Sequence, residues 1–94
     1  MIYAIAFDLD LELLQQSHPA PSATARYDDI CKLLEPLGFS RVQDTLYFGG
    51  VGINAVTCVL AVQKLSREYV WFKNSVRDIR MLRIEEVNDM KPAL

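Results

Sequence analysis

The 94-residue chain has few of the residues that mark specialised classes of protein, with two cysteines, one histidine and four glycines. Two cysteines without a secretory context do not make a disulfide framework, so we expect a cytoplasmic protein. The first residues, MIYAIAFDLD, lack a basic segment, and Asp8 and Asp10 interrupt the apolar run, so we expect no secretory signal. The longest apolar stretches, near residues 1–7 and 55–62, are too short to cross a membrane.

An excess of positive charge is also absent, since ten Lys and Arg side chains stand against twelve Asp and Glu, a net charge of −2. This balance argues against a globally basic nucleic-acid binder. Residues 1–50 carry three basic and seven acidic side chains, whereas residues 51–94 carry seven basic and five acidic ones. An acidic half and a basic half can serve a metal and a phosphate respectively, and solvated faces explain such modest numbers equally well.

Apolar side chains, in contrast, are abundant at 51% of the residues. The length predicts one domain over 1–94, with a loose tail over 88–94. The composition excludes a disordered chain, because such chains are apolar-poor and highly charged. A domain of this size buries only about 60–65% of the surface of its unfolded chain. The apolar excess therefore points to a partner subunit.

Hydrophobic periodicity predicts an alternation of strands and helices. In chain order the elements are a strand over Met1–Phe7, a helix that Ser22 or Thr24 caps and that Pro36 and Gly38 stop, short strands over Phe39–Val42 and Leu46–Phe48, a helix capped by Asn54, and a strand over Val76–Glu85. The segment Leu9–Ser22 is predicted as a loop with a helical start. The order βαββαβ predicts a ferredoxin-like α+β fold, with two helices on one face of a four-stranded antiparallel sheet.

Two apolar stripes bear on how these elements pack. The second long helix has the expected buried stripe Ala55, Cys58, Val59, Val62, Leu65 and Tyr69. The first strand is apolar on both faces, with Tyr3, Ile5 and Phe7 on one and Ile2, Ala4 and Ala6 on the other. An open sheet face with this character favours a homodimer that packs sheet to sheet.

Asp8 is the first candidate for chemistry, because its carboxylate ends an apolar strand on the small-residue face. A two-fold axis there brings the two copies of Asp8 together, where they share a proton or bind Mg²⁺ or another divalent cation. Asp10 has the same strand parity and is a candidate second metal ligand. The alternative is that Asp8 caps the strand end through backbone hydrogen bonds, with Asp10 a loop charge.

Arg77, Arg80 and Arg83 form the second candidate group, since guanidinium groups near a sheet surface hold phosphate oxygens. Tyr47, with Trp71 and Phe72, is a candidate for stacking on RNA bases. The alternative is that the arginines pair with carboxylates and fix the strand. That role is at least as compatible with the spacing; the carboxylates available are those of Asp78, Glu85 and Glu86.

Other residue types give no chemical motif. His18 is alone in a proline-rich loop without a cysteine or carboxylate at metal-ligand spacing. Cys31 and Cys58 lie on the apolar stripes of their helices, as inert buried thiols do. The glycines at 49, 50 and 52 lack the GK[ST] context of a phosphate-binding loop.

Longer stretches of the sequence resemble one known family. They are YAIAFDLD at Tyr3–Asp10, YxDI and LExxGF within Tyr27–Phe39, LYFGG at Leu46–Gly50, AVxxVLAVQxL at Ala55–Leu65 and WFKNSVRDIRMLRIEE at Trp71–Glu86. Together they cover nearly the whole chain and resemble the virulence-associated protein D family, which is similar in fold to the small CRISPR-associated adaptation nucleases.

The resemblance implies a dimeric ferredoxin-like endoribonuclease, in some members the toxin of a toxin–antitoxin pair. It also implies a catalytic role for Asp8, at the end of the first strand. The leading hypothesis is therefore an RNA-cleaving homodimer in which Asp8 binds a divalent cation or acts as general base and the arginines hold phosphates. The alternative is a non-catalytic homodimeric interaction module that binds an antitoxin or another partner protein.

Overall fold

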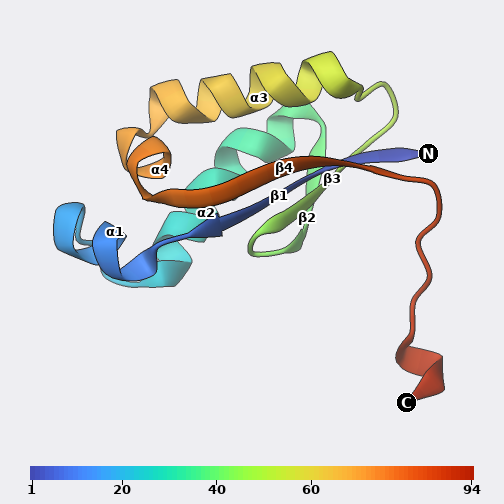
Figure 1. Cartoon of the computed structure of the whole chain (residues 1–94), viewed down its shortest axis with the longest axis horizontal. Helices are drawn as coiled ribbons and strands as arrows, with labels where there is room; N and C mark the ends of the chain where they lie inside the picture. The colour runs from blue at the N-terminus through green and yellow to red at the C-terminus, as the bar shows by residue number, and fades with distance from the viewer.

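The computed structural model describes residues 1–22 and 24–94 and has the predicted α+β architecture (Figure 1). The elements in chain order are β1 (Ile2–Leu9), α1 (Leu11–Ser17), α2 (Ala23–Leu34), β2 (Phe39–Gln43), β3 (Leu46–Gly49), α3 (Ala55–Glu68), α4 (Val70–Ser75) and β4 (Val76–Ile84), with short 3-10 helices at Glu35–Leu37 and Lys91–Ala93. The four strands form one antiparallel sheet in the order β2-β3-β1-β4. This strand order confirms the ferredoxin-like prediction.

Local capping explains where the helices begin. Ser22 accepts a hydrogen bond from the backbone N–H of Ala25 and starts α2. Asn54 and Thr57 form a reciprocal capping box at the start of α3. Asp10 caps α1 through one hydrogen bond, which its carboxylate accepts from the N–H of Leu13, and for this reason Leu11–Ser17 is a helix where the sequence pattern predicts mainly a loop.

The main core lies between one face of the sheet and the helices that cover it. β1 contributes alternate side chains, Ile5, Phe7 and Leu9, all of which are buried. The buried side chains of α3 are Cys58, Ala61 and Leu65. The prediction that Val59 belongs to this stripe is wrong, because its side chain is 51% exposed. The apolar side chains of α3 point to most sides of the helix, so the periodicity of the sequence alone does not define its buried face.

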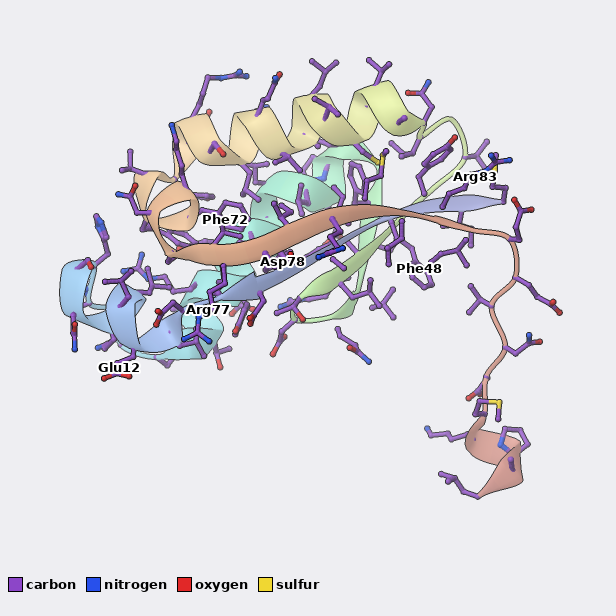
Figure 2. All side chains as sticks on the ribbon, in the orientation of Figure 1. Glu12, Phe48, Phe72, Arg77, Asp78 and Arg83 are labelled. Carbon is purple, nitrogen blue, oxygen red and sulfur yellow. The ribbon has the colours of Figure 1, made fainter. Side chains whose placement is uncertain are left out.

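The opposite face of the sheet carries no helix among the residues described, and we call it the open face (Figure 1). The strand register places an apolar group of side chains on it: Ile2, Ala4 and Ala6 of β1, Leu46 and Phe48 of β3, and Leu82 and Ile84 of β4. Figure 2 shows Phe48 on the side of the sheet away from α3. The first strand is thus apolar on both faces, as predicted.

Two further observations concern the C-terminal residues and the length of the helices. After β4 the chain leaves the sheet, and the side chains of residues 85–94 are all exposed (Figure 1). Within the described ranges, none of the helices has the length and apolar character needed to span a bilayer.

Candidate active site

Asp8 lies on the open face at the end of β1, just before the register shift between Asp8 and Leu9. Its side chain is exposed, and its strand partner across the β1–β4 ladder is Asp78. Within 1–22 and 24–94, no hydrogen bond or ion pair engages the Asp8 carboxylate. The alternative in which Asp8 caps the strand end therefore finds no contact to support it, and this carboxylate is available to a ligand.

Asp10 has a different environment, although it is only two residues away. One carboxylate oxygen accepts the N–H of Leu13 at 2.9 Å, and the other pairs with Nη2 of Arg77 at 3.4 Å. The pKa of Asp10 is lowered, chiefly by the hydrogen bond from Leu13, with desolvation opposing it and Arg77 adding to it. Both oxygens of the Asp10 carboxylate are thus engaged within the chain, where they stabilise the start of α1. A metal ion would have to compete with these contacts.

The donor set of one copy does not form a metal centre. The part of the chain that the structure describes contains no group of three or more His, Cys, Asp or Glu side chains placed to hold a metal ion. Asp8 faces only Asp78 across the sheet, and Asp10 is engaged elsewhere. A divalent cation at Asp8 would therefore take its remaining ligands from water, from the substrate or from a second copy.

The three arginines of β4 do not converge on one site, and Figure 2 shows Arg77 and Arg83 at opposite ends of the strand. Arg77 pairs with Asp10 beside the register shift. Arg83 lies opposite Tyr3, five residues along β1 from Asp8, which at the rise of a strand is about 17 Å. Arg83 contacts the sulfur of Met1 and pairs with Glu85 at 3.5 Å.

Arg80 is the arginine that shares the open face with Asp8, because it pairs across the sheet with Ala6, two residues before Asp8. Its Nε donates to both carboxylate oxygens of Asp78, at 3.2 and 3.0 Å. The hydrogen bond with Asp78 raises the pKa of Arg80. Sequence reasoning treated Asp78 only as a pairing partner and missed that it faces Asp8. The pairing of β1 with β4 was the signal that would have found it.

The prediction that Tyr47 binds RNA is wrong. Tyr47 is fully buried and stacks with Phe7 at a centroid distance of 6.4 Å. Its β1 partner is Ile5, a core residue, so strand parity directs Tyr47 toward the helices and its neighbour Phe48 toward the open face. Trp71 and Phe72, which α4 holds in the core, are buried as well. Phe48 is the aromatic residue that the open face does carry.

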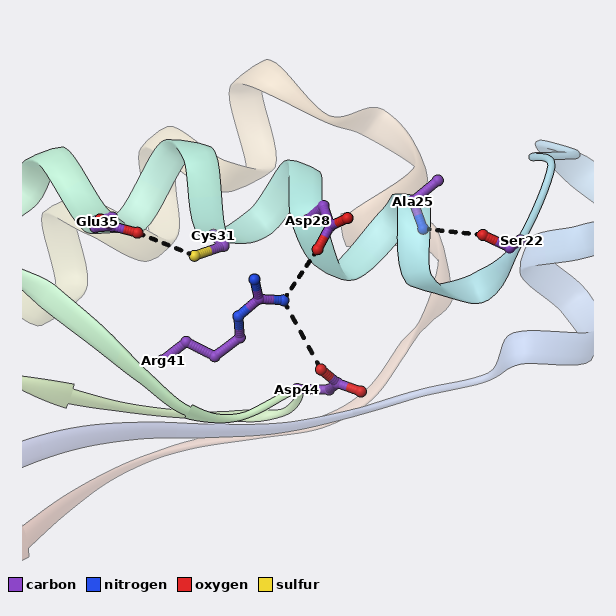
Figure 3. A network of polar contacts seen from close by, with 7 residues as sticks. All are labelled: Ser22, Ala25, Asp28, Cys31, Glu35, Arg41 and Asp44. Atoms are coloured by element: carbon purple, nitrogen blue, oxygen red, sulfur yellow. Dashed lines mark hydrogen bonds and ion pairs between the residues drawn. The ribbon is translucent and has the colours of Figure 1, made fainter.

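A second polar network lies at the other edge of the sheet and has a structural role (Figure 3). Nη1 of Arg41 in β2 pairs with Asp28 of α2 at 3.1 Å and with Asp44 of the hairpin turn at 3.8 Å. In the same helix, the thiol of Cys31 donates to Glu35 at 3.3 Å. The Arg41 ion pairs tie the β2–β3 hairpin to α2. The other thiol, Cys58, has its pKa raised by burial, as expected of an unreactive core cysteine.

The fold and this site define a small ferredoxin-like α+β protein with an unpartnered carboxylate and a neighbouring guanidinium at one end of an exposed sheet face. Comparison with known proteins identifies the family to which the chain belongs. The chain belongs to the VapD family, because several relatives are similar to it over nearly their whole length. No family model matches the chain.

Three of these relatives illustrate the range of similarity. Endoribonuclease VapD 2 of Riemerella anatipestifer is 46% identical over 93 residues, 99% of each chain. An endoribonuclease VapD homolog of Helicobacter pylori is 45% identical over 93 residues, 99% of this chain and 96% of its own. Endoribonuclease VapD of Haemophilus influenzae is 38% identical over 88 residues, 94% of this chain and 92% of its own.

Proposed function

We propose that the protein is an endoribonuclease that cleaves RNA phosphodiester bonds at the Asp8 end of its open face. The observation that carries this proposal is the exposed Asp8 carboxylate, which no described residue engages, on the same face as Arg80. The relatives named endoribonucleases support it, since their similarity extends over the segments that hold both residues.

The two side chains have complementary tasks in such a reaction. The Asp8 carboxylate accepts the proton of the attacking hydroxyl or water, which raises the nucleophilicity of that oxygen. As this oxygen bonds to phosphorus, the P–O bond to the leaving nucleotide breaks, and the leaving oxygen takes a proton from water. The Arg80 guanidinium binds the scissile phosphate and stabilises the charge that develops on its oxygens. Because Arg77 and Arg83 are paired with Asp10 and Glu85, they contribute to binding only where RNA displaces these carboxylates.

The active unit in this proposal is a homodimer formed through the open face. The support is the apolar surface there, where Phe48 and Ile84 are only partly buried and Leu82 is 39% exposed. Removing such a surface from water favours association. A two-fold axis at this face brings Asp8 of the second copy toward the first, and the two carboxylates would together be ligands for a divalent cation that keeps several of its waters.

We extend the proposal to the biological setting. The protein acts in the cytoplasm as the toxin of a toxin–antitoxin pair or as a virulence-associated factor, with an antitoxin protein as a further partner. The resemblance to the VapD family is the support for this setting. An antitoxin encoded beside the gene is expected to suppress RNA cleavage when it is added to the purified enzyme in equimolar amount.

A second candidate function is a non-catalytic dimeric interaction module. The exposed apolar side chains on α3 favour it, since Val56, Val59 and Leu60 are more than half exposed on a surface distinct from the open face. In this case the purified protein leaves RNA intact with or without Mg²⁺, and charged substitutions at Val56 or Leu60 of α3 weaken the capture of a partner.

The test is a time course of cleavage of a defined RNA by the wild type and by Asp8→Asn, which keeps the shape and removes the charge. Loss of the proton acceptor is expected to lower the cleavage rate by about 10²–10⁴-fold. The matched control is Asp89→Asn, which removes a carboxylate from the exposed tail and leaves the rate unchanged. Cleavage by Asp8→Asn at the parental rate would refute the mechanism. Parallel arms with EDTA and with added Mg²⁺ determine whether the cation takes part.

A further inference from the structure

We propose that Asp78 is a positioning residue. It holds the Arg80 guanidinium on the open face beside Asp8, so that the terminal nitrogens of Arg80 are directed toward a phosphate. The inference deepens the proposed function and rests on the role given there to Arg80. Asp78 itself touches neither the attacking group nor the leaving group in this scheme. Its action is exerted through Arg80.

The manner in which Asp78 holds Arg80 is the first argument. Both carboxylate oxygens of Asp78 accept from the same nitrogen, Nε, at 3.2 and 3.0 Å. This contact orients the plane of the guanidinium and leaves Nη1 and Nη2, with their four N–H groups, unengaged by any residue that the structure describes. Those two nitrogens form the fork that binds phosphate oxygens bidentately.

The other arginines of β4 are held in a different way. Nη2 of Arg77 pairs with Asp10, and Nη2 of Arg83 pairs with Glu85. In both cases the protein carboxylate takes a terminal nitrogen that a phosphate would need. Among the arginines of this strand, Arg80 is therefore the one whose ion pair presents the phosphate-binding end to solvent.

The position of Asp78 across from Asp8 is the second argument. Two carboxylates directly opposite each other on neighbouring strands repel, and a nearby guanidinium offsets that repulsion. Arg80 has two carboxylates within its neighbourhood on one face, Asp78 and Asp8. Because Asp78 holds Nε, Arg80 is kept from closing onto Asp8, and the Asp8 carboxylate stays free to accept a proton.

A purely structural role accounts poorly for this arrangement. The side chains of Arg80 and Asp78 are 71% and 50% exposed, and ion pairs as exposed as this contribute little to stability. The pairing of β4 with β1 along residues 76–84 holds the strand in place without their help. Removal of the Asp78 carboxylate is therefore expected to leave the fold intact, so that a change in activity can be assigned to function and not to unfolding.

The experiment is a double-mutant cycle on the full-length protein, with kcat and KM measured on a defined RNA for Asp78→Asn, Arg80→Gln and the double variant. Arg80→Gln is expected to lower kcat/KM by about 10²-fold, as loss of one charge-stabilising donor does. Asp78→Asn is expected to lower it by about 10-fold, since a free guanidinium still reaches the phosphate part of the time. The double variant is expected to match Arg80→Gln alone within about twofold, because Asp78 has no effect without Arg80.

Two further variants complete the design. Asp78→Glu keeps a carboxylate within reach of Nε and is expected to restore most of the activity lost in Asp78→Asn. Asp28→Asn breaks the Arg41–Asp28 pair at the other edge of the sheet, where the Asp28 side chain is 47% exposed, and is expected to leave kcat/KM unchanged. The unfolding temperature of each variant shows that the fold is retained.

The outcomes separate the two proposals. If the losses for Asp78→Asn and Arg80→Gln multiply in the double variant, Asp78 acts independently and the positioning role is wrong. A parental rate for Asp78→Asn overturns it as well. A parental rate for Arg80→Gln removes Arg80 from the proposed function and the inference falls with it, whereas a parental rate for Asp8→Asn refutes the proposed proton acceptor itself.

Discussion

Single residues on this sheet are assigned their roles by strand parity. Tyr47 and Phe48 are neighbours in β3, yet one is fully buried against Phe7 and the other lies on the open face. The same parity separates Arg80 from Arg83 in β4. An aromatic or basic residue in a strand is therefore a candidate for RNA binding only once the face it occupies is known.

Tyr47 provides a test of this distinction. Its buried hydroxyl has no hydrogen-bond partner among the residues described, so Tyr47→Phe removes an unsatisfied polar group. We expect the variant to gain about 1 kcal/mol in the free energy of unfolding and to keep its RNA-cleaving activity. Urea titration and the cleavage assay measure the two effects. A loss of activity with intact stability would restore the RNA-binding role.

The same residue predicts a dependence of stability on pH. Burial raises the pKa of Tyr47 above its ordinary value of 10.0, so above that pH the unfolded chain loses this proton before the folded chain does. The stabilisation is therefore complete below about pH 10 and is lost as the pH rises further. Urea midpoints at pH 8 and pH 10.5 are expected to fall more steeply for the wild type than for Tyr47→Phe. Equal slopes would contradict the assignment.

Individual helices and strands were predictable to the extent that their signals are local. The cap at Asn54 and the apolar alternation of β1 identify these elements from sequence alone, since each depends on residues a few positions apart. For α2 the sequence offered Ser22 or Thr24 as the cap, and the structure selects Ser22. The helix α1 was underestimated because a seven-residue helix with one buried side chain, Leu14, has little periodicity. The buried face of α3 was misassigned at Val59, since only the packing partner selects among several apolar sides.

The capping box of α3 gives a prediction for this element. Asn54→Ala removes the side chain that accepts the N–H of Thr57 at 3.0 Å and is expected to destabilise the fold by about 1 kcal/mol. Asn54→Asp, which can accept the same hydrogen bond, is expected to retain the parental stability. Chemical denaturation of the three proteins is the measurement. An unchanged midpoint for Asn54→Ala would show that tertiary packing alone holds the start of α3.

For the molecule as a whole, the apolar excess of the composition is found in three places: the core between sheet and helices, the open face, and the exposed side of α3. The second of these supports the proposed homodimer, and it adjoins the end of the sheet that carries Asp8. If the dimer forms as proposed, the Asp8 site and the dimer interface share one surface. A substitution that weakens dimerisation is then expected to lower RNA cleavage as well.

The dimer proposal predicts the effect of charge on this face. Phe48→Asp places a carboxylate within the apolar group and is expected to weaken association by about 30-fold or more, as removal of a central aromatic contact does. Val56→Asp, on the exposed side of α3, is the matched control and is expected to leave the association constant unchanged. Light scattering over a dilution series measures both. A wild type that is strictly monomeric at micromolar concentration would exclude the paired arrangement of Asp8.

The sequence by itself determined the order of the elements, the helix caps, the two apolar faces of β1 and the position of Asp8 at a strand end. These features depend on neighbours along the chain, where periodicity and capping patterns act. Only the tertiary structure decided that Arg80 shares a face with Asp8, that Asp78 lies opposite it, and that Tyr47 is buried. These features depend on the register between strands far apart in sequence, which no local pattern specifies.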